Sequence, residues 1–269
     1  MEKLRQIQID LLKNFISVCE TLGIQYFMVC GSVLGAVKYQ GYVPWDDDID
    51  VALLRPDYEL FMEKAQALLP KYIFVQNYYS DPAYASISGK LRNSNTTFIE
   101  ASAMYQQINH GVYIDVFPID GYPESWIGQQ ILEIRKTWYK IKLLTVINTK
   151  ASPKVEIMKK FFRLSGVHKR IPKILKKYED MISRYSVADA KVWCNHGNWQ
   201  GKLEYADRDQ YGNGTLGSFE GIQVRLPENT EAYLTQKYGQ WREDLPEELK
   251  KSHHYFEIYD PEESYKKYT

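Results

Sequence analysis

This chain of 269 residues has few cysteines, no long apolar run and no net charge. Its three cysteines, Cys19, Cys30 and Cys194, are odd in number and widely spaced, which excludes a disulfide framework and favours a reducing compartment. The charged start of the chain has no apolar core of a signal peptide. The longest uncharged stretch near it, residues 25–37, is shorter than the about 20 apolar residues of a membrane span. We therefore expect a cytoplasmic protein.

Charge is balanced overall, with 34 Lys and Arg against 34 Asp and Glu, but it is unevenly distributed. Residues 133–177 hold 14 Lys and Arg and only two Glu, a local charge of +12. Apolar and aromatic residues are interleaved among them, as in a helix that lies at a membrane surface. The segment predicts an anionic partner, either a membrane or a polyanionic glycan. Solvated helix faces are the alternative, and nothing resembles a nucleic-acid module, so no nucleic-acid partner is expected.

Hydrophobic periodicity predicts an α/β arrangement for the first 120 residues and mainly helices for the next 65. The elements expected from it are a helix at 3–22, a strand at 24–30, a short helix at 33–38, a strand at 49–54, a helix at 56–69, strands at 72–76, 85–91 and 112–117, helices through 125–185, a strand at 222–226 and a helix at 229–238. Pro118 is expected to end the strand before it, and Asp120 to lie in a turn. We divide the chain into a core at 1–123, a basic helical insertion at 124–186 and a C-terminal region at 187–269 that returns to the core.

An acidic cluster, Asp46-Asp47-Asp48-Ile49-Asp50, is the most informative part of the sequence. Asp48 and Asp50 are two residues apart, so on a strand both side chains leave the same face. Two carboxylates on one face suit Mg²⁺ or Mn²⁺, with substrate phosphates completing the coordination. The alternative is a solvated turn, but an Asp-x-Asp that enters an apolar strand is not typical of a turn.

Further residues fit phosphate chemistry. Gly31 and Ser32 follow a predicted strand and precede a helix, where backbone N–H groups can hold phosphate. Asp115 stands within an apolar strand and is the candidate third carboxylate, for a metal or for an acceptor proton; an edge-strand surface residue is the other interpretation. Lys90 and Arg92 share a strand face and can contact phosphate, or they are surface charges.

These residues resemble the LicD family of phosphotransferases. The similarity covers residues 1–120 and roughly 215–260. It rests on these motifs: Gly31-Ser32-x-Leu34-Gly35-Ala36, Val43 to Val51, Arg55-Pro56-Asp57-Tyr58, Lys90-Leu91-Arg92 with Thr97, His110-Gly111 with Ile114 to Asp120, Tyr233-Leu234, Tyr238-Gly239-Gln240-Trp241 and His253-His254.

The resemblance implies a bacterial enzyme with a nucleotidyltransferase-like α+β fold. In that fold helices flank a mixed β-sheet, and here the basic helical insertion is added to it. It implies metal-dependent transfer of phosphocholine from CDP-choline to a sugar hydroxyl of a surface glycan precursor, teichoic acid or lipooligosaccharide, with release of CMP. It also implies a lipid-linked acceptor at the inner face of the cell membrane. Carried onto this sequence, the metal ligands are Asp48, Asp50 and Asp115, with Asp46 assisting.

Other site residues follow from the same resemblance. Gly31 and Ser32 become the phosphate turn, and Lys38 contacts phosphate where relatives often carry Arg-His. Trp45 is one of many aromatic side chains that could face a choline cation. His254, in the closing motif, either lines the site or lies on the surface.

Three alternatives stay open at this point. This protein could transfer glycerol phosphate or another polyol phosphate from a CDP-alcohol in capsule synthesis. A different enzyme of the same fold could transfer a nucleotide from an NTP and release pyrophosphate. A protein with a degenerate site could bind membrane surfaces through its basic helices.

Overall fold

A mixed seven-stranded sheet forms the centre of the computed structural model, which describes residues 1–198, 201–247, 250 and 256–269. The helices are α1 (Glu2–Leu22), α2 (Cys30–Tyr39), α3 (Arg55–Leu68), α4 (Trp126–Leu143), α5 (Pro153–Leu164), α6 (Ile171–Ile182), α7 (Arg208–Tyr211) and α8 (Thr230–Tyr238), with 3₁₀ turns η1 (Val167–Arg170), η2 (Gly201–Glu204) and η4 (Tyr265–Lys267). The strands are β1 (Tyr26–Met28), β2 (Asp50–Leu54), β3 (Ile73–Gln76), β4 (Gly89–Asn93), β5 (Thr97–Glu100), β6 (Val112–Gly121), β7 (Val192–Asn195), β8 (Tyr205–Asp207), β9 (Thr215–Phe219), β10 (Ile222–Leu226) and β11 (Phe256–Asp260).

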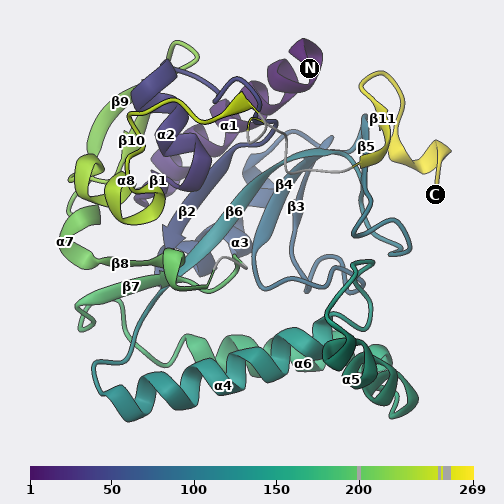
Figure 1. Ribbon diagram of the computed structural model, residues 1–269. Helices are drawn as coiled ribbons and strands as arrows, with labels where there is room; N and C mark the ends of the chain where they lie inside the picture. Colours follow the sequence, from purple (N-terminus) through teal and green to yellow (C-terminus); the bar gives the residue numbers. More distant parts are fainter. Residues whose placement is uncertain (199–200, 248–249, 251–255) are drawn as a thin grey trace.

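Strand β6 organises the sheet and runs through its middle (Figure 1). It pairs in parallel with β2 along one side. Along the other side it pairs antiparallel, first with β4 and then, near its C-terminal end, with β7. All ten of its residues are buried. Two separate antiparallel pairs lie outside this sheet: the hairpin β9–β10, and β5–β11, whose strands are far apart in the sequence. The α+β class predicted from the sequence is confirmed.

The two faces of the sheet have different roles because side chains alternate along a strand. Val51, Ile114 and Leu91 belong to the main apolar core, together with Phe15 of α1 and Phe61 of α3. The alternate positions of the same strands carry polar and charged side chains. One face therefore packs on helices α1 and α3, and the other is left for the site.

The basic segment forms a helical layer below the sheet in Figure 1. Helix α4 packs on α6 and α5, and the second apolar cluster joins Leu132, Leu175 and Tyr178 of this layer to Tyr78 and Ile87 of the 77–88 connection. None of the helices among the described residues combines the length and apolar character needed to cross a bilayer. The three-part division at residues 123 and 186 stays a proposal.

The expectation that Pro118 ends its strand is wrong. Strand β6 continues to Gly121, with Pro118 paired in register with Leu53 of β2. On the opposite side, pairing with β4 ends at Val116 and pairing with β7 begins at Ile119. Pro118 stands in this gap, where its missing N–H costs no ladder hydrogen bond.

The interpretation of Asp120 as a turn residue is also wrong. Asp120 lies in β6, is fully buried, and accepts two hydrogen bonds of 2.7 Å from the Arg55 guanidinium. The strand expected at 85–91 is shifted to Gly89–Asn93, and the sequence did not predict β5, β7, β8, β9 or β11.

Candidate active site

Three aspartates converge on the polar face of the sheet. Asp50 of β2 and Asp115 of β6 are register partners in adjacent parallel strands, so their side chains leave the same face. Asp48 lies two residues before Asp50. One carboxylate oxygen from each of the three lies within 4.8 Å of the others. Three hard oxygen donors at this spacing form a site that can hold a divalent cation.

Helix α1 fixes the loop that carries the acidic cluster. The Arg5 guanidinium donates to the carbonyl oxygens of Pro44, at 3.1 Å, and Asp46, at 2.8 Å. The Gln8 amide donates to the carbonyl of Asp47 at 2.8 Å. These bonds hold the backbone before β2 from outside the sheet, so that the acidic side chains enter it in a defined direction.

The Gly31-Ser32 pair lies at the start of α2 and shapes the site in two ways. The Ser32 hydroxyl accepts a hydrogen bond of 2.8 Å from the Asp50 N–H, which ties α2 to β2. A Cβ at Gly31 would lie 2.5 Å from an Asp46 carboxylate oxygen, so only glycine lets that side chain approach. Gly31 lines the cavity described below, whereas Ser32 is buried behind it.

Lys90 is the cation beside the aspartates. It is the register partner of Asp115 on β4, and its Nζ lies 3.3 Å from carboxylate oxygens of both Asp115 and Glu100. The same ammonium lies 3.2 Å above the centre of the Tyr113 ring. Because Lys90 is almost fully buried, these anionic and aromatic partners offset its loss of hydration.

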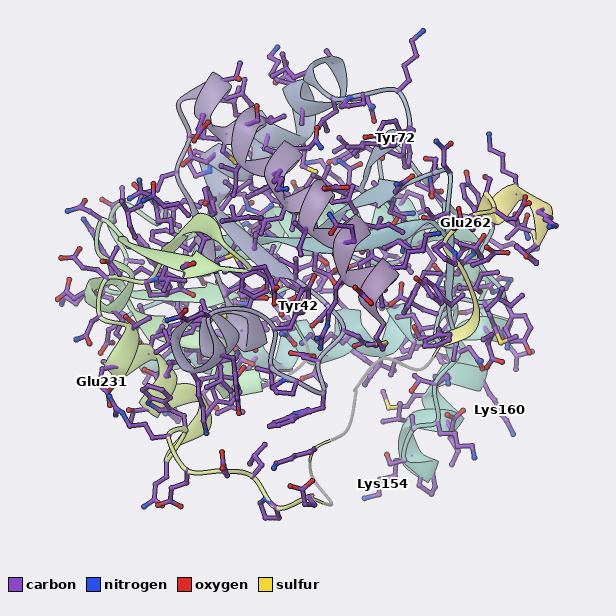
Figure 2. The ribbon with its side chains drawn as sticks, turned by 90° about the horizontal axis from the view of Figure 1, so that it is seen from above. Tyr42, Tyr72, Lys154, Lys160, Glu231 and Glu262 are labelled. Atoms are coloured by element: carbon purple, nitrogen blue, oxygen red, sulfur yellow. The ribbon has the colours of Figure 1, made fainter. Side chains whose placement is uncertain are left out.

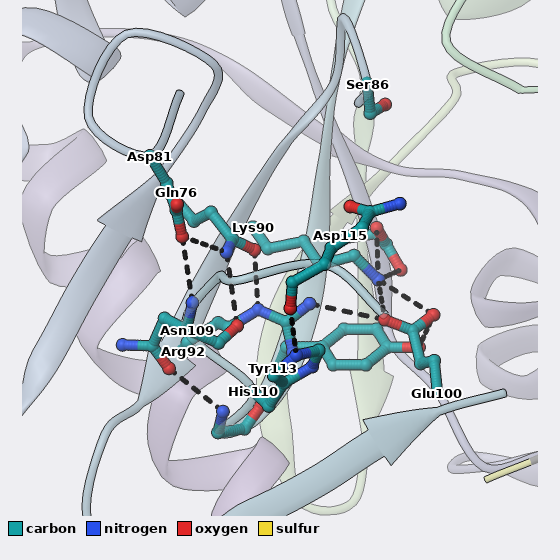
Figure 3. A network of polar contacts seen from close by, with 12 residues as sticks. Gln76, Asp81, Ser86, Lys90, Arg92, Glu100, Asn109, His110, Tyr113 and Asp115 are labelled. Atoms are coloured by element: carbon teal, nitrogen blue, oxygen red, sulfur yellow. Dashed lines mark hydrogen bonds and ion pairs between the residues drawn. The ribbon is translucent and has the colours of Figure 1, made fainter. Parts of the chain in front are cut away.

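A buried hydrogen-bond network holds Lys90 and Glu100 in place (Figure 3). Arg92 is fully buried and donates to Gln76, to the carbonyl of Gly111 and to Glu100. Tyr113 donates to Glu100 at 2.9 Å, and burial, then the Glu100 charge, raise the pKa of Tyr113 well above its ordinary value. The phenol therefore stays protonated and remains a donor.

A cavity of about 820 Å³ opens over these carboxylates. Most of the predicted site residues line it. They are Asp46, Asp48 and Asp50 of the acidic cluster, the adjacent Trp45, and Asp115, Lys90 and Gly31. Its walls come from five distant stretches of chain: the α2–β2 region, the β3–β6 region, the α4–α5 connection, residues 197–198 after β7, and the C-terminal region near Tyr238.

Not every predicted site residue reaches this cavity. Arg92 is not among its lining residues and contacts only protein acceptors in the network above. Lys38 instead donates to the carbonyls of Arg242 and Glu243 and pairs with Asp244 at 3.1 Å. His254 lies outside the described residues.

The cavity also has lining residues that sequence reasoning missed. Glu100, Tyr84, Phe117, Tyr238 and the α4–α5 connection at 144–151 all contribute to it. A signal existed for Glu100, which ends the short apolar run Thr97-Phe98-Ile99. Sequence alone offered no signal for Tyr84, because only the fold brings it to the carboxylates. Tyr238 belongs to a motif of the family resemblance, but that motif did not assign it to the site.

Comparison with known proteins finds a nucleotidyltransferase family in the part of the chain that carries this site. Residues 23–150, which include the three aspartates, match the family model described as LicD/FKTN/FKRP, nucleotidyltransferase domain. The region that carries the three aspartates is a LicD-family domain. The chain is therefore an enzyme of the phosphotransferase type.

Relatives of this chain include one of nearly the same length. The lipopolysaccharide cholinephosphotransferase LicD of Haemophilus influenzae is 25% identical over 278 aligned residues, which cover 93% of this chain and 94% of the relative. An uncharacterized protein of Rickettsia prowazekii is 28% identical over 44% of this chain and 40% of its own length. An uncharacterized protein of Rickettsia typhi is 34% identical over 23% of this chain and 19% of its own length.

Proposed function

We propose that this protein transfers phosphocholine from CDP-choline to a sugar hydroxyl of a cell-surface glycan precursor, teichoic acid or lipooligosaccharide, and releases CMP. The observation that carries the proposal is the convergence of Asp48, Asp50 and Asp115 in one cavity. The Haemophilus relative, which is named a cholinephosphotransferase and aligns along nearly the whole chain, supports phosphocholine as the group transferred.

The metal proposed for the site is Mg²⁺ or Mn²⁺, held by Asp48, Asp50 and Asp115 with Asp46 beside them. Carboxylate oxygens are the donors that these hard cations prefer, and the three-residue cluster fits them. When bound, such an ion would neutralise charge on the donor's phosphates and stabilise the charge that develops during transfer. No protein nitrogen or sulfur ligand belongs to this cluster among the described residues.

The chain's own residues would bind and orient the reactants. The acceptor hydroxyl attacks the phosphorus that bears choline, the bond from that phosphorus to the bridging oxygen breaks, and CMP leaves with that oxygen. Lys90 lines the cavity and supplies a positive charge for a phosphate oxygen. Asp115 either completes the metal site or accepts the proton of the attacking hydroxyl. Trp45 lines the cavity, and in this proposal its ring would contact the quaternary ammonium of choline.

The acceptor in this proposal is lipid-linked, so the enzyme would work at the inner face of the cell membrane. Residues 133–177, with their charge of +12, would contact anionic lipid there. This part of the proposal concerns location and is tested separately below.

The test is calorimetric titration of the full chain with CDP-choline, CDP-glycerol, CDP-ribitol and CTP, each with and without Mg²⁺. We expect Mg²⁺-dependent binding of CDP-choline and release of CMP in the presence of a glycan acceptor. Asp48→Asn should abolish both, whereas the matched variant Asp10→Asn, on the exposed side of α1, should change neither.

Each other outcome would replace the proposal. Preference for CDP-glycerol or CDP-ribitol would change the cargo to a polyol phosphate. Preference for CTP with release of pyrophosphate would make the reaction nucleotidyl transfer. Absence of any Mg²⁺-dependent binding would contradict a catalytic role for the three aspartates.

A further inference from the structure

Helix α4 exposes an apolar stripe. Ile127, Ile131, Ile134 and Trp138 recur at intervals of four, three and four residues, which puts them on one side of the helix. They are 48% to 68% exposed, while Leu132, on the other side, is buried against α6. A solvent-facing helix surface of this length is normally polar, so an exposed apolar stripe indicates a contact with something else.

Helix α5 extends the same surface. Ile157, Phe161 and Leu164 follow at intervals of four and three residues and are even more exposed, Leu164 at 90%. Aromatic contacts join the two stripes. The ring centroid of Trp138 lies 5.3 Å from that of the buried Phe162, and the Phe162 centroid lies 5.8 Å from that of the exposed Phe161. We call the exposed residues of both helices, Ile127, Ile131, Ile134, Trp138, Ile157, Phe161 and Leu164, the α4–α5 apolar face.

The exposed charges around this face are predominantly positive. Every fully exposed charged residue from 133 to 177 is Lys or Arg, and both glutamates of that segment are only partly exposed. Lys154 and Lys160 flank the α5 stripe and project from the periphery of the molecule (Figure 2). Lys142 lies within 6 Å of the Trp138 and Phe162 rings. An apolar stripe with cationic borders and tryptophan beside them matches an anionic bilayer surface.

The same two helices lead into the cavity. The connection between α4 and α5 contributes part of the cavity wall, through Leu144, Ile147, Thr149, Lys150 and Ala151. The three aspartates line another part of the same cavity. Asn148 fixes this connection to the β5 side by donating to the Ala101 carbonyl at 2.9 Å. The α4–α5 apolar face and this part of the cavity wall therefore belong to one continuous segment, made of two helices and their connection.

We propose that the α4–α5 apolar face inserts among the acyl chains of an anionic bilayer, and that the 144–151 wall thereby meets acceptors anchored in that bilayer. Insertion itself follows from the surface alone, and only the delivery of an acceptor rests on the proposed function. A second copy of this chain is a poorer occupant, because two such faces would bring their lysines and arginines together.

The experiment is flotation of the full chain with vesicles of phosphatidylcholine alone or with 30% phosphatidylglycerol, at about 50 and about 500 mM salt. We expect binding to the anionic vesicles that weakens with salt, as surface charges are screened. Vesicles with brominated acyl chains should quench tryptophan fluorescence, and Trp138→Phe should remove part of that quenching.

Two variants separate the apolar from the charged contribution. Ile134→Gln/Phe161→Gln should reduce binding and quenching, with Leu68→Gln/Leu216→Gln, at two other exposed apolar positions, as the matched control. Lys154→Glu/Lys160→Glu should weaken binding to anionic vesicles by at least about 25-fold, since each nearby cation is worth roughly five-fold. Lys13→Glu/Lys71→Glu is its control.

Several results would overturn the inference. These are absence of flotation at low salt, unchanged quenching in Ile134→Gln/Phe161→Gln, or sedimentation that shows a dimer disrupted by that variant without any lipid binding. Failure of the proposed function is distinguished by Asp48→Asn, which should float like the wild type. Transfer to a water-soluble acceptor should conversely survive in Ile134→Gln/Phe161→Gln.

Discussion

Asp115 has a like charge on one side and an opposite charge on the other. In β2 its register partner is Asp50, and in β4 its partner is Lys90, whose ammonium lies 3.3 Å away. The lysine offsets part of the repulsion among the carboxylates, and Glu100 and Tyr113 hold the lysine in turn. The register of β2, β6 and β4 therefore brings Asp50, Asp115 and Lys90 side by side in the site.

Asp50→Asn should weaken Mn²⁺ binding by more than about 100-fold, because it removes a charged ligand and loss of even an outer-shell partner costs 10–100-fold. The size of the side chain is kept, so the fold should survive. Titration followed by electron paramagnetic resonance measures free Mn²⁺ directly, and circular dichroism checks the fold. Mn²⁺ binding equal to that of the wild type would contradict the assignment of Asp50 as a ligand.

His196 makes stability depend on pH. Burial, then the charge of Lys136, lower the pKa of His196 well below its ordinary value of 6.5, and its Nδ1 lies 3.3 Å from the Cys194 sulfur. Below pH 6.5 the unfolded chain takes a proton at this position that the folded chain does not. The free energy of unfolding should therefore fall by up to about 1.4 kcal/mol per pH unit from this residue as the pH decreases.

Urea unfolding of the wild type and His196→Gln between pH 5 and 8 measures this contribution. The variant should show the shallower decrease below pH 6.5, because its side chain does not titrate. Curves that stay parallel over the whole range would show that His196 does not carry the pH dependence.

Arg55 joins three elements at the scale of secondary structure. It begins α3 and donates two hydrogen bonds of 2.7 Å to Asp120 of β6 and one of 3.0 Å to Glu179 of α6. Tyr78, from the 77–88 connection, donates to the same Glu179. The helical layer is thereby tied to the sheet by buried charges as well as by its apolar cluster.

Arg55→Met should lower the free energy of unfolding by about 3–5 kcal/mol, because it leaves Asp120 charged and fully buried without its cation. The control is Arg242→Met, which breaks an ion pair with Glu231. Both of those side chains are more than half exposed, so this substitution should change stability far less than Arg55→Met. If the two substitutions lowered the free energy of unfolding equally in urea unfolding, burial of the Arg55–Asp120 pair would not make it more important for stability than an exposed pair.

The whole molecule assembles one cavity from stretches that are more than 200 residues apart, from Cys30 to Leu245. No single element could hold both the carboxylates and the walls around them. Binding at this centre must therefore stabilise the assembled fold over the unfolded chain, in which the three aspartates are separated.

Saturating Mn²⁺ should accordingly raise the melting temperature. At a concentration of 100 times the dissociation constant the gain is about 2.7 kcal/mol, which corresponds to about 5–10 °C for a chain of this size. A chelator should reverse the shift, and Asp48→Asn should lack it. Differential scanning calorimetry measures the shift, and an equal one in Asp48→Asn would place the bound ion elsewhere.

Regular elements with strong periodicity could be predicted from sequence, and irregular pairings could not. The helix expected at 3–22 is α1, with Gly23 as its left-handed cap, and the strand expected at 222–226 is β10. Short strands such as β5 and β7 have four residues each, too few to show a period. Pro118 and Asp120 were misinterpreted because both read as strand breakers unless the neighbouring strands are known.

The sequence by itself determined the residue types and their spacing: the Asp-x-Asp entering a strand, the Gly-Ser pair before a helix, and the basic helical segment. These are local patterns, and local sterics and charge express them directly. Only the tertiary structure decided that Lys90 lies beside Asp115 while Arg92 and Lys38 have other partners. It alone also decided which apolar residues of α4 and α5 remain exposed, since burial depends on the packing of distant segments rather than on a residue's own neighbours.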